Sequence, residues 1–409
     1  MSDLKTIRGM PDLYGENIEA ISMVEEICLK TFKSFNYKEF RTPVVEYKSI
    51  FERTAGETSD IIQKKEVFEL AERKGEMLCL RPEGTATLVR ALITNGLDDD
   101  EIKKFFYLGP MFRYERPQKG RKRQFFQAGV ELIGDQSSDA DIEIILIADM
   151  ILNKLNIKST LVINYLGDQE SLKKYNKYLQ EYLTASQDLP EYVTKNPIRA
   201  LDSKDEDIKN RMSQAKSIIN FLDKNQIEEF NKIKLKLDEA GIKFKENPNL
   251  VRGMDYYNGL VFEFLSDELG AQNAILGGGR YDGLIKSLGG RDLPATGFAL
   301  GIDRIAEIVK AKSIERDLFI GCVDKESRTY AQALGYKIRG NNSSLVVENY
   351  LGSANVGKQL KKADSQGFKF AIIVGQDELK SKTLKLKNLR DDKPDLELKE
   401  KDLLEHFEC

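Results

Sequence analysis

Two apolar segments that flank a short basic stretch constrain the fold of this 409-residue chain more than any other feature. FFYLGPMFRY (residues 105–114) and FFQAGVELIG (residues 125–134) are rich in aromatic and aliphatic residues, as strands usually are. Residues 113–123 hold six basic side chains against a single glutamate. We therefore predict an antiparallel hairpin with a long, basic tip.

Composition indicates an ordinary globular protein and excludes several chemistries. Hydrophobic residues make up 41% and charged residues 32%, with a net charge of −3. No apolar stretch approaches ~20 residues and the start lacks the apolar core of a signal peptide, so we expect no membrane segment. The four cysteines lie far apart and form no C-x-x-C pair, which argues against a zinc site or a disulfide framework and favours a cytoplasmic location. Because His406 is the sole histidine in the sequence, histidine-dependent catalysis in the core is excluded.

Local patterns predict further elements of the first part of the chain. Apolar residues recur at helical spacing over residues 17–32. Ser138 and Asp141 form a capping-box pattern before an apolar helix over residues 142–155. Additional strands are predicted over residues 41–47, 77–80, 250–257, 260–265 and 271–279.

Two shifts in composition predict the domain organisation. Residues 1–313 are expected to form an α+β domain with a mainly antiparallel sheet, interrupted by a Lys- and Glu-rich helical insertion at about 168–247. Over residues 317–409 short strands alternate with helices, one of which covers residues 354–367 and ends at a glycine. This alternation predicts a separate α/β domain of about 90 residues.

The predicted hairpin carries polar groups that need an explanation. By the period-2 rule, Arg113 and Glu115 share one face, and so do Gln127 and Glu131. A solvated outer face is the ordinary interpretation of such a pattern. Both strands are otherwise apolar or aromatic, however, and isolated charges are costly to bury, so we favour a ligand-binding face.

Three more motifs add arginines and glycines. LVRGMDYY contains Arg252, GGGRYDG places three glycines before Arg280, and GFALGIDRI puts Arg304 at an expected helix start. Guanidinium groups suit phosphate and carboxylate, and glycines let a ligand approach the backbone. In RPEGT, capping of a helix by Thr85 is the simplest interpretation. Without a histidine, the set suits phosphoryl or nucleotidyl chemistry, which depends on positioning and charge neutralisation.

Across nearly its whole length the chain resembles the histidyl-tRNA synthetase family, within the class II aminoacyl-tRNA synthetases. The resemblance runs from IRGMPD through RTPVVEY with GETSDIIQKKEVF, RPEGT, FRYERPQKGRKRQF, LVRGMDYY, GGGRYDG and GFALGIDRI to ANVGKQLKKADSQG. It implies an aminoacyl-tRNA ligase that activates L-histidine with ATP and transfers it to the 3′ end of tRNA(His). It also implies Mg²⁺ on the ATP phosphates, a homodimer, and a C-terminal domain that binds the anticodon.

The resemblance also assigns roles to residues. Its histidine-binding positions correspond to Glu83, Gly84, Thr85, Gln127, Glu131, Arg252, Tyr256, Tyr257 and Tyr281. Its ATP-binding positions correspond to Arg113, Glu115, Phe125 and Arg304. Arg113 and Arg252 are the implied catalytic residues, and Arg116 and Gln118 are expected to meet the acceptor end of the tRNA. The chain departs from the family at Phe126, where histidine is common, and at Lys122, where an aromatic is common.

Two other functions compete with this one. A non-catalytic, histidine-binding regulatory subunit of ATP phosphoribosyltransferase would share the fold, but such subunits usually have degraded ATP motifs and no anticodon domain. In this chain Arg113, Arg252 and Arg304 are retained and an α/β domain follows, so we favour the ligase. A protein that only binds RNA would have no use for glutamates on the sheet face, because carboxylates repel phosphate.

Overall fold

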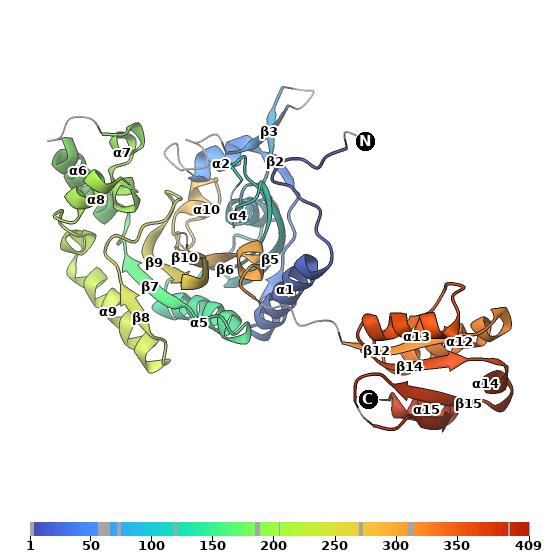
Figure 1. Ribbon diagram of the computed structural model, residues 1–409. Helices are drawn as coiled ribbons and strands as arrows, with labels where there is room; N and C mark the ends of the chain where they lie inside the picture. The colour runs from blue at the N-terminus through green and yellow to red at the C-terminus, as the bar shows by residue number, and fades with distance from the viewer. Residues whose placement is uncertain are drawn as a thin grey trace. The chain divides into compact units, whose positions relative to one another are not determined.

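The computed structural model describes residues 4–55, 66–71, 75–117, 121–184, 189–203, 205–269, 273–309, 315–391 and 393–408. The chain divides into two compact units, Met1–Ala311 and Lys312–Cys409 (Figure 1). In the part of the chain that is described, no helix combines the length and the apolar character needed to cross a membrane.

A large sheet forms the centre of the first unit. Among the described residues it has eight strands in the order β1-β5-β6-β11-β10-β9-β7-β8. Their bounds are β1 Lys38–Glu39, β5 Lys103–Phe112, β6 Gln124–Ile133, β11 Ala295–Gly301, β10 Ala274–Arg280, β9 Asn258–Leu265, β7 Thr160–Tyr165 and β8 Phe244–Glu246. Only the two edge strands, β1 and β8, pair in parallel. The predicted hairpin β5–β6 and the mainly antiparallel sheet are therefore confirmed.

Helices cover both faces of this sheet. One face carries α1 (Glu16–Ser34), α5 (Ser138–Lys154), α9 (Lys224–Glu239) and α11 (Ile302–Ala306), which share the main core. Within that core, the rings of Phe32 and Phe106 lie 5.2 Å apart. On the other face, α4 (Thr85–Thr94) and α10 (Leu284–Ser287) pack on Phe105 and Tyr107. Each fully buried side chain of this kind contributes roughly 1.5–3 kcal/mol to stability.

A small sheet stands beside the large one. Its strands β2 (Val45–Tyr47), β4 (Met77–Leu80) and β3 (Phe68–Ala71) are antiparallel in the order β2-β4-β3. Helix α2 (Lys48–Ala55) follows β2 directly. Glu46 and Cys79 are buried on one face of this sheet, which leaves the apolar neighbours of Glu46 exposed on the other.

The helices after β7 gather around a core of their own. They are α6 (Gln169–Thr184), α7 (Glu191–Lys195), η1 (Pro197–Asp202), α8 (Glu206–Met212) and η2 (Ile218–Phe221). Their core is built from side chains such as Tyr175, Leu179, Val193, Ala200 and Ile208. Helix α9 packs instead on α5, and β8 joins the large sheet. The predicted boundaries of the two domains (1–313 and 317–409) and of the insertion (about 168–247) remain predictions.

Two local predictions are wrong. The N-cap of α5 is Ser137 and makes no side-chain capping bond, because Asp141 pairs with the buried Arg280 at 3.0 Å instead of capping the helix. Residues 250–257 are irregular rather than a strand, because side chains take the place of a strand partner. The side chain of Asn164 donates to the Leu250 carbonyl (2.9 Å), and that of Arg199 donates to the Arg252 carbonyl (2.9 Å).

The second unit is an α/β domain. Its described sheet has the order β13-β12-β14-β15-β16, parallel over the first three strands and antiparallel beyond. In chain order the elements are β12 (Arg316–Cys322), α12 (Lys325–Asn341), β13 (Val347–Asn349), α13 (Val356–Ser365), β14 (Phe368–Val374), α14 (Gln376–Ser381), β15 (Thr383–Asn388), β16 (Leu396–Lys399) and α15 (Glu400–His406). Gly367, with φ of 84°, follows α13 at the expected place.

Candidate active site

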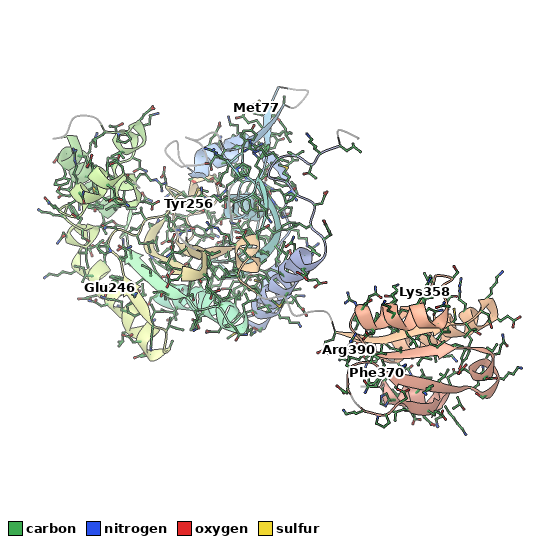
Figure 2. All side chains as sticks on the ribbon, viewed as in Figure 1. Met77, Glu246, Tyr256, Lys358, Phe370 and Arg390 are labelled. Atoms are coloured by element: carbon green, nitrogen blue, oxygen red, sulfur yellow. The ribbon has the colours of Figure 1, made fainter. Side chains whose placement is uncertain are left out.

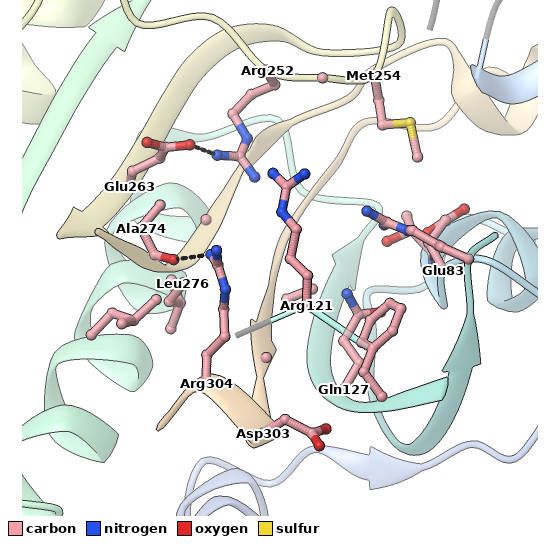
Figure 3. Close-up of a pocket in the computed structure, with 18 of the residues that line it drawn as sticks. Glu83, Arg121, Gln127, Arg252, Met254, Glu263, Ala274, Leu276, Asp303 and Arg304 are labelled. Carbon is pink, nitrogen blue, oxygen red and sulfur yellow. Dashed lines mark hydrogen bonds and ion pairs between the residues drawn. The ribbon is translucent and has the colours of Figure 1, made fainter. Parts of the chain in front are cut away.

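A cavity of about 360 Å³ opens on the face of the large sheet that carries α4 (Figure 3). It gathers residues from five separate motifs. The predicted site residues that line it are Glu83, Thr85, Arg113, Glu115, Phe125, Gln127, Arg252, Tyr256, Tyr257 and Arg304. Gly84, Glu131 and Tyr281 are absent from this lining, Arg116 is exposed, and Gln118 lies outside the described residues.

Glu83 shapes the wall of the cavity at the start of α4. Its two carboxylate oxygens accept the backbone N–H groups of Thr85 (2.6 Å) and Ala86 (2.8 Å). The helix is thus capped by Glu83 and not by Thr85, which corrects the simplest sequence interpretation. Burial raises the pKa of Glu83. Gly84 has no room for a side chain, since a Cβ there would collide with the Tyr107 ring.

Glu131 lies one layer behind the cavity. It is 1% exposed and accepts hydrogen bonds from Thr85 Oγ1 (2.7 Å) and the Tyr281 hydroxyl (2.5 Å). Burial raises the pKa of Glu131 to about 8. Thr85 therefore connects Glu131 to the cavity wall. Beside it, Gln127 Oε1 is buried and has no hydrogen-bond partner among the described residues, so a ligand donor could use it.

Guanidinium groups converge on the opposite side. Figure 3 shows those of Arg121, Arg252 and Arg304 pointing toward the same space. Arg252 pairs with Glu263, and Arg304 donates to the Ala274 carbonyl (2.6 Å). Burial is the largest single influence on Arg252 and lowers its pKa, but Glu263 together with Tyr257 and Tyr256 outweighs burial, so the pKa of Arg252 is raised.

Like charges meet within this set. Burial lowers the pKa of Arg304, and the positive charge of Arg121 lowers it further. Cations brought this close are stabilised by an anionic ligand. Arg113 is held separately: its Nε donates to the Pro82 carbonyl (3.0 Å), and its guanidinium carbon lies 5.4 Å from the centre of the Phe125 ring.

Several cavity residues were not assigned a role from the sequence. Arg121 pairs with Glu115 at 3.1 Å, and Lys122 pairs with Asp303 at 2.8 Å. Arg121 and Lys122 belong to the basic stretch already noted, whereas Glu263 is an acidic residue in the apolar run LVFEFL. An unexplained acid inside a buried strand is the signal that could have found Glu263.

The carboxylates of the cavity do not form a magnesium site. Within the described ranges no group of three His, Cys, Asp or Glu side chains could hold a metal ion. Glu83 already binds backbone N–H groups, while Glu115 and Glu263 are paired with arginines.

An antiparallel sheet with this cavity on its open face, followed by a separate α/β domain, defines a class II aminoacyl-tRNA synthetase. Two family models match the chain: "Histidyl-tRNA synthetase" over residues 9–305 and "Anticodon binding domain" over residues 317–408. A histidine–tRNA ligase of Hydrogenovibrio crunogenus is 37% identical over 401 residues, which cover 95% of this chain and 94% of that protein. The chain therefore belongs to the histidyl-tRNA synthetase family.

Solved structures agree with this assignment. The apo histidyl-tRNA synthetase of S. aureus is 30% identical, with a TM-score of 0.81 and coverage of 99% of both chains. An ATP phosphoribosyltransferase regulatory subunit/histidyl-tRNA synthetase from Bacillus halodurans shares the fold at 23% identity and a TM-score of 0.68, covering 92% of this chain and 99% of that one. These comparisons do not support a regulatory subunit of ATP phosphoribosyltransferase better than a histidine–tRNA ligase. The activity is that of an ATP-dependent aminoacyl-tRNA ligase, with histidine and tRNA as partners.

Proposed function

We propose that this cavity joins L-histidine to ATP as histidyl-adenylate, and that the same site then passes histidine to the 3′ end of tRNA(His). The observation that carries the proposal is the convergence of Arg113, Arg252 and Arg304 with Glu83 and Gln127 on one cavity. These residues come from motifs spread over more than half of the sequence.

The amino acid would bind at the α4 side. Its α-ammonium group would meet the Glu83 carboxylate, Thr85 and the unpaired Gln127 Oε1. The imidazole would be read by Tyr257 and by Glu131, with Tyr281 holding Glu131 from behind. A wrong side chain would disturb the bonds of Glu131 to Thr85 and Tyr281 without replacing them, which is a basis for rejection.

ATP would bind at the arginine side. Phe125 and Arg304 would hold the adenine between them, and Glu115 would contact the nucleotide. Arg113 and Arg252 would flank the α-phosphate. A histidine carboxylate oxygen then attacks the α-phosphorus, a P–O bond forms, and pyrophosphate leaves with the electrons of the broken bond. The guanidinium groups stabilise the charge that develops on the phosphoryl oxygens.

In the second step a terminal ribose hydroxyl of the tRNA attacks the carbonyl carbon of the adenylate, and AMP leaves. Arg116, exposed at the tip of the hairpin, and Gln118 would contact the acceptor end. Residues 317–409 would bind the anticodon. Mg²⁺ would accompany the ATP phosphates, and the cytoplasm is the compartment that the buried free thiols Cys28, Cys79 and Cys322 favour.

We further propose a homodimer built on the small sheet. Val45 (41% exposed), Tyr47 (47%) and Leu70 (40%) lie on its outer face, where Tyr47 and Leu70 both flank Leu78. Met77, labelled in Figure 2, begins β4 and is 43% exposed, but strand alternation places it on the opposite face, with Cys79. The segment at residues 56–68, which resembles a dimer-forming motif, lies largely outside the described residues. A second copy would cover the apolar face through a two-fold axis.

Light scattering tests the dimer. We expect twice the mass of one chain for the wild type and a monomer for Tyr47→Glu, because a buried carboxylate would be unpaired in the interface. Tyr336→Glu, at a residue that is 79% exposed on the second unit, is the matched control and should keep the wild-type mass. A dimeric Tyr47→Glu protein would contradict the proposed interface.

The proposed reaction is tested by histidine-dependent exchange of pyrophosphate into ATP. We expect exchange with histidine and none with other amino acids. Its absence in folded protein would favour the regulatory or RNA-binding alternatives. Cutting the chain after about residue 314 should leave exchange intact but lower tRNA charging, because the anticodon-binding unit is lost. Full tRNA charging by the truncated protein would show that the second unit does not bind the tRNA anticodon as proposed.

A further inference from the structure

The segment that carries Arg252 is held in place by side chains from elsewhere. Residues 250–257 have no helix or strand of their own, so their backbone groups need outside partners. Asn164, on β7, donates to the carbonyls of Pro248 (3.2 Å) and Leu250 (2.9 Å) at the start of the segment. These bonds fix where the segment begins but do not reach Arg252.

The helical insertion supplies the next fixed points. Arg199 belongs to η1, is 7% exposed, and donates from Nη1 to the backbone carbonyl of Arg252 (2.9 Å). A Cβ on Gly253 would stand 3.9 Å from the same nitrogen, so the guanidinium group lies directly against the loop. Asn196, three residues earlier, donates to the Asp255 carboxylate (3.0 Å). The insertion therefore contacts the loop on both sides of Gly253.

The side chain of Arg252 is held from a different direction. Its guanidinium group pairs with Glu263 on β9 and lies over Gly277 on β10, where a Cβ would collide with it. The sheet thus fixes the charged end of Arg252, and the insertion fixes the backbone from which that side chain starts. Both ends must be fixed for the guanidinium group to keep one position.

We propose that Arg199 is a positioning residue for Arg252, so that the helical insertion sets the geometry of the phosphate-binding arginine. This inference rests on the role proposed above for Arg252. A displacement of about 1 Å at a reacting centre can cost about 100-fold in rate. Tyr257, by contrast, adjoins β9 and lies edge-on to Tyr281, which follows β10, at 6.5 Å between ring centres, so it has a contact that Arg199 does not supply.

The experiment measures pyrophosphate exchange on full-length variants. For Arg199→Ala we expect kcat to fall at least tenfold while the KM for histidine changes less than twofold, because only the phosphate partner moves. Arg199→Lys can still donate one hydrogen bond and should recover most of the wild-type kcat. Arg211→Ala, on an exposed arginine of α8 in the same insertion, is the control and should behave like wild type. An unchanged kcat for Arg199→Ala would overturn the inference, as would a loss of equal size for Arg199→Lys.

Two further measurements keep the result decisive. Should Arg199→Ala not fold, Asn196→Ala removes the second contact from a half-buried position and should lower kcat about threefold at an unchanged melting temperature; a wild-type kcat there would overturn the inference. Arg252→Ala is assayed in parallel. Normal exchange in Arg252→Ala would refute the proposed function, whereas loss of exchange there with a normal Arg199→Ala would refute only the role of Arg199.

Discussion

The two sides of the cavity differ in the charges that they bring together. On the α4 side, Glu131, Thr85 and Tyr281 bond to one another, and Glu83 bonds to the helix backbone. On the other side, Arg121 and Arg304 bring like charges together. A hydrogen-bonded network that exists before binding suits selection of one amino acid, because a wrong ligand would break its hydrogen bonds without forming new ones. A group of cations suits catalysis, because charge that develops on a phosphate relieves their repulsion.

Removing Arg252 should separate the two sides most sharply. Arg252→Ala should lower exchange by at least about 10³-fold, because the developing phosphate charge loses a partner. Histidine binding, measured by calorimetry, should change much less, since Glu83 and Gln127 remain. Arg211→Ala is again the control. Exchange close to wild type would show that the charge is stabilised elsewhere.

Removing Glu131 should give the complementary result. Glu131→Ala is expected to raise the KM for histidine about 10- to 100-fold and to weaken selection against other amino acids, because Thr85 and Tyr281 lose their shared acceptor. The kcat at saturating histidine should fall less. Steady-state exchange with histidine and with competing amino acids measures both effects. An unchanged KM would mean that the imidazole is read by other residues.

The burial of Glu131 also predicts a pH dependence of stability. Its folded-state pKa of about 8 lies above the ordinary value of 4.5, so between these values the folded state holds a proton that the unfolded chain has released. Stability from this group is therefore present at low pH and decreases as pH rises toward 8. Relative to Glu131→Gln, the wild type should lose up to about 2 kcal/mol between pH 6 and 8. Thermal melting across this range measures the difference, and parallel curves for the two proteins would contradict the shift.

Much of the fold was predictable because its elements have strong local patterns. The hairpin β5–β6 has two apolar strands around a polar tip, and α1 has apolar residues at helical spacing. The strand predicted over residues 250–257 failed because its carbonyls are bonded by Asn164 and Arg199, which are distant in sequence. The capping box failed for a similar reason, since Asp141 is used by Arg280. Long-range side-chain partners leave no local signal.

The site was predictable to a similar degree. Charged residues in apolar strands, together with the family resemblance, led to the side chains that line the cavity. The sequence could not show that Glu131 lies behind Thr85, because depth behind a wall depends on how strands and helices pack. Nor could it show that Arg252 is paired with Glu263, since both are charged residues of adjoining motifs whose orientation only the fold determines.

The smallest expected effect concerns the contact that ties the hairpin to α11. Lys122 Nζ lies 2.8 Å from Asp303, which also accepts the backbone N–H of Phe126 (2.5 Å) and directly precedes Arg304. Lys122→Met should remove the partner of Asp303 and so loosen the neighbouring Arg304, which should raise the KM for ATP. We expect a rise of only about threefold, because a partly exposed ion pair contributes little. The KM for histidine should stay constant, since Lys122 belongs to the arginine side. Lys286→Met removes an exposed pair with Asp292 and serves as the control. A change in the KM for histidine of equal size would show that the two sides of the cavity are coupled through the β5–β6 hairpin and are not separate binding regions.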